Sequence, residues 1–319
     1  MKKSQYTSPR YMLCIFSWFV LGFVFFFPHC AQHPPAVSEA AVSEAISPEA
    51  VPVIALSTEQ IIPNTQTKKP THILLIGQDR REEEPRSRSD CMILCSFVPE
   101  KGILTMTSFL RDLYVRIPGY GCNRLNAAYA FGGMSLIRET FRDNFGISVD
   151  GCVEVDFSQF SQLIDLLGGV TITLRKDEAA HINAETPGSS LSSGQQLLNG
   201  AEALAYCRIR SLDEDGDFSR TERQRNILTA LLKRCKNASV PEMFQLFRKA
   251  APLVSTDIRK TELFTLIRQV IPSLSRLKVS SLRIPAEGTY SHRIIDGMAV
   301  LVTDLEAARN LLHESLSEP

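Results

Sequence analysis

Several features of common protein classes are missing from this sequence of 319 residues, beginning with an excess of charge of either sign. Lys plus Arg and Asp plus Glu each number 35, so the formal net charge is zero. Nucleic-acid-binding proteins usually carry a basic excess, so this balance argues against a nucleic-acid partner. Neither nucleotide-binding fingerprint, GxGxxG or GxxxxGK, occurs, and the GxSxG elbow of serine hydrolases is absent too. Any anion must therefore be recognised by local clusters of charge.

The cysteines give little sign of a metal site or a disulfide framework. The chain has 8 cysteines but no CxxC pair, which argues against a zinc site. Cys91 and Cys95 lie on one face of an expected strand, about 13 Å apart and too far to bridge. We expect most of the cysteines to behave as small buried apolar residues. The disulfide pairing and the oligomeric state stay open.

The N-terminal region predicts a membrane anchor. Residues 1–10 contain Lys2, Lys3 and Arg10, and an uncharged run rich in Phe, Val and Leu follows at 11–27. At about 1.5 Å per residue, this run approaches the length needed to span a bilayer as a helix. The positive flank favours a cytoplasmic N-terminus, which places the rest of a single-pass chain outside the cell membrane. A cleaved signal peptide is the alternative, and Cys30 is a weak indication of a lipoprotein.

Residues 28–70 have the composition of a disordered linker. The sequence Ala-Val-Ser-Glu-Ala occurs twice in succession, at 36–40 and 41–45, and prolines are frequent. Such a segment lacks the apolar periodicity that a packed core needs. We therefore expect a tether here, and an extracytoplasmic domain over residues 71–319.

Strand and helix patterns interleave throughout that domain. Strands are expected at 72–77, 91–98, 103–107, 152–156, 170–174, 205–210, 279–284 and 298–302. Helices are expected at 125–131, 134–144, 157–167, 195–205, 220–236, 241–250, 260–271 and 304–315, with a loop at 175–193. This alternation predicts an α/β fold, a three-layer α/β/α sandwich with a central mixed sheet.

Two arginines in the expected strand at 205–210 form the first candidate anion site. Alternate side chains of a strand share a face, so Arg208 and Arg210 would point together. Two guanidinium groups on one face repel each other unless an anion lies between them, and their planar forks suit phosphate oxygens. The alternative is a solvated basic edge.

The segment that follows favours the interpretation as an anion site. Ser219 and Glu222 match a capping box, so we expect a helix to begin there. Arg220 and Gln224 would lie on the inward face of this helix, and free NH groups at its start would also attract an anion. An ordinary salt bridge from Arg220 to Asp217 is the competing interpretation.

Acidic residues at expected strand ends suggest a metal site. Asp79 follows the first strand, and Asp90 precedes the second, after a polar loop that includes Arg88. Two carboxylates beside phosphate-binding arginines suit magnesium, with water and phosphate as the other ligands. Taken alone, each Asp is more simply a cap or turn residue. Arg111 leaves the end of the third strand in the same way.

Six ordered motifs resemble those of the LytR–CpsA–Psr family. They read GQDRR…RSD, SFLRD, NRLNAAYAFGG, DLLGGV, LNGAEALAYCRIR and GDFSRTERQ. The similarity covers residues 71 to about 236, and the expected anchor fits the family's topology. The resemblance implies an α/β/α sandwich with an apolar pocket for a polyprenyl tail. It also implies an enzyme, a phosphotransferase that moves teichoic acid, capsule or a related anionic glycopolymer from a polyprenyl-pyrophosphate carrier to the peptidoglycan glycan strand.

The resemblance also assigns roles to individual residues. Asp79 and Asp90 would hold Mg²⁺, and Asp217 would orient the arginines that bind the pyrophosphate. The pyrophosphate would be bound by Arg88, Arg111, Arg208, Arg210, Arg220 and Gln224. A sugar hydroxyl would attack the sugar-linked phosphate and polyprenyl phosphate would leave, with Asp79 as the first candidate general base and Asp217 as the second.

Two other functions stay open at this point. Hydrolysis of the lipid-linked sugar would use the same pocket with water as the acceptor. A non-catalytic envelope regulator or polyanion-binding module is the alternative from a different class. The sequence does not indicate which polymer or acceptor sugar is used.

Overall fold

The computed structural model describes residues 69–79, 88–213, 216–237, 240–270, 273 and 276–317. These residues belong to one compact unit, Gln66–Pro319. The expected anchor at 11–27, and the expected linker up to residue 68, lie outside the described residues. Within the described ranges, we find no helix with the length and apolarity that a bilayer crossing requires.

A six-stranded mixed sheet lies at the centre of this unit. Its strands are β1 (Thr71–Gln78), β2 (Ser89–Val98), β3 (Ile103–Phe109), β6 (Gly151–Asp156), β9 (Ser255–Thr256) and β10 (Lys278–Ile284). Their spatial order is β10-β3-β2-β1-β6-β9. β1 runs antiparallel to β2 and parallel to β6, and β3 runs antiparallel to β2 and parallel to β10. The mixed central sheet is therefore confirmed.

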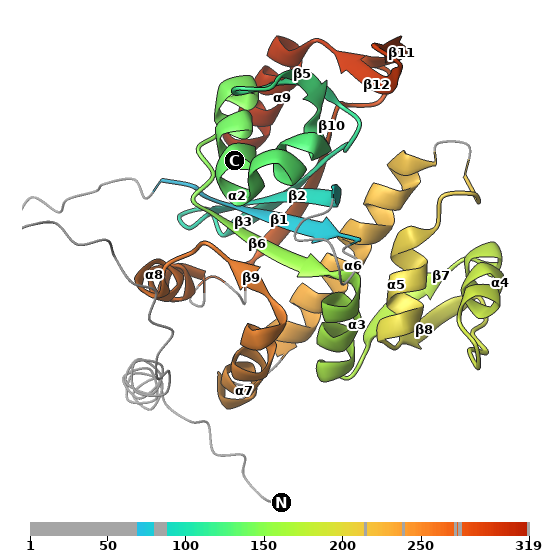
Figure 1. Ribbon diagram of the computed structural model, residues 1–319. Helices are drawn as coiled ribbons and strands as arrows, with labels where there is room; N and C mark the ends of the chain where they lie inside the picture. The colour runs from blue at the N-terminus through green and yellow to red at the C-terminus, as the bar shows by residue number, and fades with distance from the viewer. Residues whose placement is uncertain are drawn as a thin grey trace, which may run out of the picture. The chain divides into compact units, whose positions relative to one another are not determined.

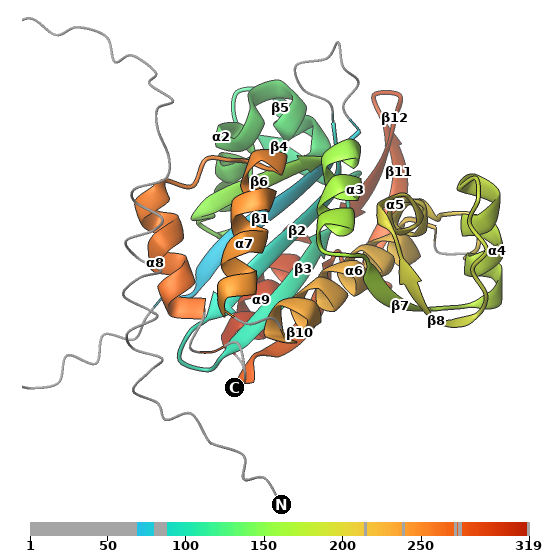
Figure 2. The same ribbon diagram turned by 90° about the horizontal axis from the view of Figure 1, so that it is seen from below.

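Helices cover both faces of the sheet. α2 (Leu125–Phe145) and α9 (Leu305–Ser317) lie on one face. α3 (Phe157–Leu166), α6 (Asp217–Asn237), α7 (Val240–Ala250) and α8 (Lys260–Val270) lie on the other, as the two views show (Figures 1 and 2). The expectation of three layers is confirmed.

Smaller elements extend this sandwich. The ribbon of β7 (Val170–Leu174) and β8 (Gly194–Leu198) packs with α4 (Lys176–Glu185) and α5 (Gly200–Arg208) beside α3 and α6. Two further hairpins are β4 (Tyr114–Ile117) with β5 (Gly121–Arg124), and β11 (Tyr290–Ile295) with β12 (Met298–Thr303). A short 3-10 turn spans Ala251–Leu253.

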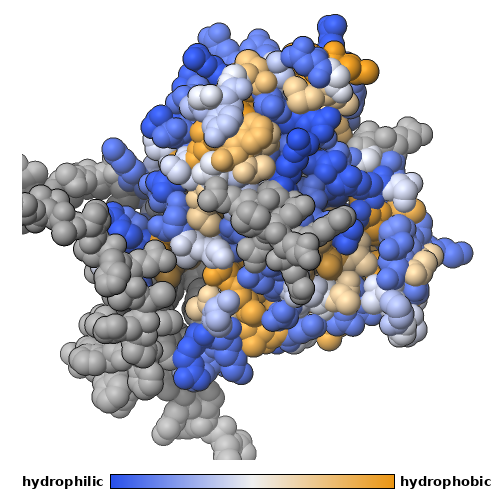
Figure 3. All heavy atoms as spheres, viewed as in Figure 1, coloured by the Kyte–Doolittle hydropathy of each residue, from blue (hydrophilic) through white to orange (hydrophobic). Residues whose placement is uncertain are grey.

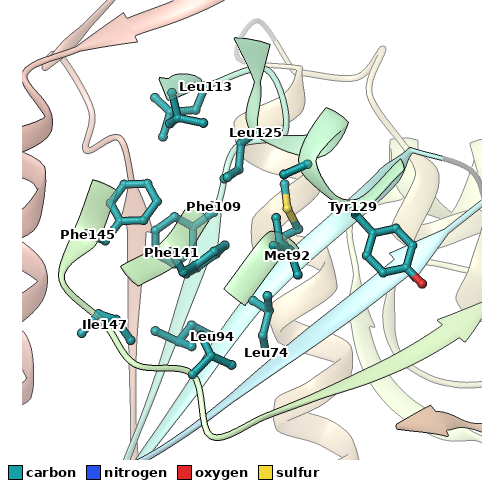
Figure 4. Packing of buried hydrophobic residues seen from close by; sticks show 14 of the residues in the cluster. Leu74, Met92, Leu94, Phe109, Leu113, Leu125, Tyr129, Phe141, Phe145 and Ile147 are labelled. Atoms are coloured by element: carbon teal, nitrogen blue, oxygen red, sulfur yellow. The ribbon is translucent and has the colours of Figure 1, made fainter. Parts of the chain in front are cut away.

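The main core fills the space between the sheet and α2. Phe109 of β3 lies 4.6 Å from Phe141 and 4.8 Å from Phe145, measured between ring centroids. Leu74 and Leu94 close the cluster from β1 and β2 (Figure 4). Each of these side chains is almost fully buried, so the burial of apolar area stabilises this face strongly.

Three local predictions are wrong or shifted. Residues 176–185, expected as loop, form α4, because the carboxylate of Glu178 caps the backbone of Arg175 and a narrow stripe of the helix is buried. The helix expected at 195–205 is instead β8 followed by α5, which starts at a capping box between Asn199 and Glu202. α6 begins at Asp217, before the expected cap at Ser219.

The expected strand at 205–210 is also wrong. α5 continues to Arg208, and its C-terminal cap is Ile209. The run of alanine and leucine before it favours helix over strand. Arg208 and Arg210 therefore do not share the face of one strand.

Candidate active site

Charged side chains from four separate segments meet beside the N-terminal end of α6. Asp90 comes from β2, and Arg111 follows β3. Arg210 follows α5, while Asp217 and Arg220 lie in the first turns of α6. We call these five residues the arginine cluster. In the space-filling view, hydrophilic side chains gather between the parts of the surface over β12 and α5 (Figure 3).

The contacts within the arginine cluster link all four segments. Nη1 of Arg111 donates to Oδ1 of Asp90 at 2.6 Å, and Nη2 of Arg220 donates to the carbonyl oxygen of Asp90 at 2.9 Å. Oδ1 of Asp217 lies 3.4 Å from Nε of Arg210 and 3.4 Å from Nε of Arg220. The salt bridge from Arg220 to Asp217 is thus present, as a part of the cluster.

Arg220 is the most enclosed arginine of the cluster. Its exposed fraction is 5%, and its Nε makes no hydrogen bond to the described residues. Burial lowers the pKa of Arg220; Asp217 opposes this effect, while Arg210 and Arg111 lower the pKa further. Its positive charge is therefore under-compensated, which is the electrostatic condition that favours binding of an anion.

Arg111 is balanced differently. Burial acts to lower the pKa of Arg111, but Asp112 and the hydrogen bond to Asp90 outweigh it, and the pKa is raised. Asp112 also lies 3.5 Å from Nε of Arg124. Arg111 is therefore held in place by acids and remains cationic.

A further cation, Arg225, was not singled out in the sequence. Its Nη1 donates to Oγ of Ser108 at 2.6 Å, where α6 packs on β3. Burial lowers the pKa of Arg225, Glu222 opposes this effect, and Arg283 lowers the pKa further. The motifs around Ser108 and Arg225 were both visible in the sequence, but no local spacing predicts that they meet.

An apolar cavity of about 240 Å³ lies next to the cluster, between the sheet and helices α3, α5 and α6. Strand side chains on the face opposite the main core form its floor. Its lining includes Leu75, Cys91, Ile93, Val153, Val155, Phe160, Leu163, Leu204, Gln224, Leu228 and Leu231. Gln224 therefore points inward on the same helix face as Arg220, as predicted. Burial raises the pKa of the Cys91 thiol to about 12, so this side chain serves as an apolar wall.

The other candidate site residues lie at the margin of this arrangement. Gln78 pairs with Ser89 across β1 and β2, so Asp79 and Arg88 lie at adjacent ends of the two strands, and both are exposed. Arg208 is exposed too, and its guanidinium carbon lies 5.0 Å from the ring centroid of Phe157. The structure does not bring Arg208 to Arg210 in the way that the expected strand would.

The residues expected to hold magnesium form a partial donor set. Within the described ranges, no group of three or more His, Cys, Asp or Glu residues is arranged to hold a metal ion. Asp79 follows the last paired residue of β1, and Asp90 is the residue of β2 left without a register partner at the shift after Gly77, so both lie at the same end of the β1–β2 pair. Two hard oxygen ligands with space for water and phosphate oxygens suit Mg²⁺, which keeps several waters in most protein sites.

Fold and site together define an α/β protein that can bind an anionic group at the mouth of an apolar cavity. Comparison with known proteins agrees with this class. The LytR_cpsA_psr family matches residues 36–315. The chain therefore belongs to the LytR–CpsA–Psr family, and that resemblance is confirmed.

Two characterised relatives differ in their described roles. The chain is 34% identical over 230 residues to the polyisoprenyl-teichoic acid–peptidoglycan teichoic acid transferase TagV of Bacillus subtilis, covering 70% of this chain and 58% of TagV. It thus spans little more than half of the length of that relative. It is 33% identical over 254 residues to the regulatory protein MsrR of Staphylococcus aureus (strain COL), covering 76% of this chain and 74% of MsrR.

Solved structures of the family match the fold. TagT bound to LIIa-WTA superposes with a TM-score of 0.64 at 28% identity, covering 82% of this chain and 94% of that chain. The TagT structure with bound octaprenyl pyrophosphate lipid gives 0.61 at 26% identity, covering 82% and 96% of the two chains. Relatives of the same fold thus include one that holds a prenyl pyrophosphate.

Proposed function

We propose that this protein transfers an anionic glycopolymer from a polyprenyl-pyrophosphate carrier to peptidoglycan. The observation that carries the proposal is the position of the arginine cluster beside the apolar cavity. A prenyl pyrophosphate has the same two parts, a charged head and an apolar tail. Gln224 lines the cavity one helical turn beyond Arg220, so head and tail would be bound side by side along α6.

The reaction would be a direct displacement at phosphorus. A hydroxyl of the glycan strand forms a bond to the sugar-linked phosphorus, and the bond from that phosphorus to the bridging oxygen breaks. Polyprenyl phosphate leaves with the electron pair, and the hydroxyl proton passes to a base. Arg111, Arg210 and Arg220 would bind the phosphate oxygens and stabilise the charge that develops on them.

Two carboxylates are candidates for the base. Asp79 is exposed at the end of β1, where it can reach an incoming substrate. Asp217 already lies between Arg210 and Arg220, and its buried Oδ1 makes no hydrogen bond to the described residues. From this position Asp217 can accept a hydrogen bond from an incoming hydroxyl and orient it.

Magnesium is part of the proposal. Asp79 and Asp90 would hold it, because they supply hard oxygen ligands at neighbouring strand ends. When bound, Mg²⁺ would supply additional neutralisation of phosphate charge. The membrane placement is a proposal as well: residues 11–27 would anchor a single-pass chain with its enzymatic domain outside the cell.

The test uses the full chain in detergent with a synthetic prenyl-pyrophosphate-linked disaccharide and a soluble glycan strand. We expect release of prenyl phosphate and covalent attachment of the disaccharide to the glycan. An Arg111→Ala variant should lose at least about tenfold in rate, since a charge-assisted bond to phosphate contributes more than about 1.5 kcal/mol. Equal rates for the two proteins would refute the assignment of the site.

The same assay separates the alternatives. Release of prenyl phosphate at the same rate without the glycan, and no attached disaccharide with it, would identify a hydrolase. A protein that binds the lipid but turns nothing over would instead match a regulatory role such as the one for which MsrR is named. Protease sensitivity of the domain on intact cells would check its expected exposure outside the membrane.

A further inference from the structure

A second pocket lies at the other side of the arginine cluster. It has a volume of about 340 Å³ and lies between the N-terminal end of α6 and the β11–β12 hairpin. We call it the hairpin pocket, and its lining comprises Asp112, Gly216, Asp217, Phe218, Tyr290, His292, Ala299, Val300 and Leu301. Unlike the apolar cavity, it combines aromatic rings with two carboxylates.

The order of side chains along α6 relates the two pockets to each other. Asp217, Arg220 and Gln224 are spaced three and four residues apart, so they lie on one face of the helix. Asp217 lines the hairpin pocket, Arg220 belongs to the arginine cluster, and Gln224 lines the apolar cavity. The rise from Asp217 to Gln224 is about 10 Å. The arginine cluster therefore lies between a pocket suited to a polar ligand and a cavity suited to a lipid.

This order fits the geometry of displacement at phosphorus. The attacking and the leaving oxygen lie roughly in line on opposite sides of the phosphorus. If the prenyl chain occupies the apolar cavity, the leaving oxygen points along α6 toward Gln224. The attacking hydroxyl must then approach from the side of Asp217, which is the side of the hairpin pocket.

The lining of the hairpin pocket suits a sugar ring. Tyr290 stacks on Phe218 at 4.7 Å between centroids, and His292 meets the edge of Tyr290 at 5.6 Å. Aromatic rings offer an apolar surface for the C–H face of a pyranose, while imidazole, phenol and carboxylate groups bond to its hydroxyls. Tyr290 is half-buried and His292 is exposed, so the polar groups of both can reach a bound ring.

The walls of the pocket are fixed by the fold. The amide of Leu301 in β12 donates to the carbonyl oxygen of Asp112 at 2.9 Å. Leu301 packs in a small apolar cluster with Leu110 and Phe218, and Tyr290 packs against that cluster. The hairpin is thus fastened to the segment after β3 and to the start of α6, both of which contribute to the arginine cluster. A sugar bound here would be held in a fixed relation to the phosphates.

We infer that the hairpin pocket binds a sugar of the acceptor glycan strand and presents its hydroxyl to the phosphorus. This inference rests on the proposed function, because it assigns the second substrate of the same reaction. Asp217 would bond to the incoming hydroxyl, while Tyr290 and His292 would hold the ring that carries it.

The test measures binding of the two ligands separately, with the full chain in detergent. The probes are a soluble peptidoglycan tetrasaccharide and a prenyl pyrophosphate that carries no sugar. The variant is Tyr290→Phe/His292→Ala, which keeps the stack on Phe218 and removes two hydrogen-bonding groups. Arg293→Ala is the matched control, because Arg293 lies next to His292 on β11 and is absent from the pocket lining.

The double variant should bind the tetrasaccharide about tenfold more weakly, as expected for the loss of hydrogen bonds to a bound ring. Its affinity for prenyl pyrophosphate, and both affinities of Arg293→Ala, should be unchanged. The inference is overturned if wild type does not bind the tetrasaccharide or if the double variant binds it equally well.

Two further measurements distinguish this inference from a donor-sugar site and from failure of the proposed function. If the double variant binds a prenyl-pyrophosphate-linked disaccharide more weakly than wild type but binds the tetrasaccharide equally well, the pocket belongs to the donor sugar and the inference is overturned. Wild type that binds the tetrasaccharide in this pocket but transfers nothing would contradict the proposed function and leave the pocket assignment intact.

Discussion

Two buried arginines three positions apart on α6, Arg220 and Arg223, have opposite electrostatic surroundings. Their exposed fractions are 5% and 3%. Arg223 donates from Nε to Oε1 of Glu178 at 2.9 Å and also bonds to Asp213. Burial acts to lower the pKa of Arg223, but these two acids outweigh it and the pKa is raised. The pKa of Arg220 is lowered.

We propose that this difference separates a structural arginine, Arg223, from one that binds an anion, Arg220. The charge of Arg223 is compensated within the protein, and its contacts tie α4 and the segment after α5 to α6. The carboxylates of Asp217 and Asp90 both act on Arg220, but Asp217 is shared with Arg210 and Asp90 with Arg111. A buried cation with incomplete compensation destabilises the protein until an anion binds, and the free energy is recovered on binding. Burial of an arginine alone therefore does not indicate its role.

The comparison is tested most strongly by Arg223→Met. This change leaves Glu178 and Asp213 without a shared cation, and Glu178 is buried. Breaking a buried ion pair in this way costs about 3–5 kcal/mol. We expect the free energy of unfolding, measured by urea denaturation, to fall by about that amount. Glu222→Gln on the exposed face of α6 is the control. If Arg223→Met lowers the free energy of unfolding by less than about 1 kcal/mol, Arg223 is not a structural arginine.

Addition of inorganic pyrophosphate should have the next largest effect. Wild type should gain about 2.7 kcal/mol of stability when the ligand is present at a hundred times its Kd. Arg220→Met should gain far less, because the cluster loses its most enclosed cation. Thermal unfolding at increasing pyrophosphate concentration measures both gains. Equal gains would show that pyrophosphate binds elsewhere.

A third arginine, Arg208, refines the comparison through catalysis. We expect Arg220→Ala to lower the rate of prenyl phosphate release at least about tenfold, equivalent to about 1.4 kcal/mol. Arg208→Ala should have a smaller effect, because Arg208 is exposed and lies over Phe157. Steady-state rates of the two variants at saturating donor decide between them. A larger loss for Arg208→Ala would indicate that Arg208 moves into the site when substrate binds.

The inward face of α6 could be predicted because its information is local. The spacing of Arg220, Gln224, Leu228 and Leu231 has the helical period, and the last three line the apolar cavity. Five of the six strands of the sheet were predicted from local patterns too, such as the continuous apolar run at 72–77 that indicates burial on both faces. The two-residue strand β9 was not predicted, because it is too short to carry a pattern.

Arg208, the last residue of α5, and Arg210, two residues later, were placed wrongly because the Arg-x-Arg pattern was interpreted as a strand. The capping box of Asn199 and Glu202 was the local signal that a helix begins there and continues to Arg208. The partners of Arg223 and Arg225 had no such signal. Glu178 is 45 positions from Arg223, and Ser108 is 117 positions from Arg225, so these contacts arise from tertiary packing alone.

The smallest effect concerns Asp213, the second acid that binds Arg223. Hydrogen bonding to Arg175 lowers the pKa of Asp213, burial opposes this effect, and the bond to Arg223 adds to the lowering. Because the folded-state pKa lies below the ordinary value, Asp213 contributes stability that is fully present above about pH 4. That contribution is lost as the pH falls through the folded-state pKa, since protonation removes the charge that both arginines bind.

We therefore expect the difference in unfolding free energy between wild type and Asp213→Asn to be largest near neutral pH and to shrink below about pH 4. Urea denaturation from pH 3 to pH 7 measures it, with Asp177→Asn, an exposed partner of Arg175, as the control. A difference that does not change with pH would mean that Asp213 acts through packing, and that the compensation of Arg223 depends on Glu178.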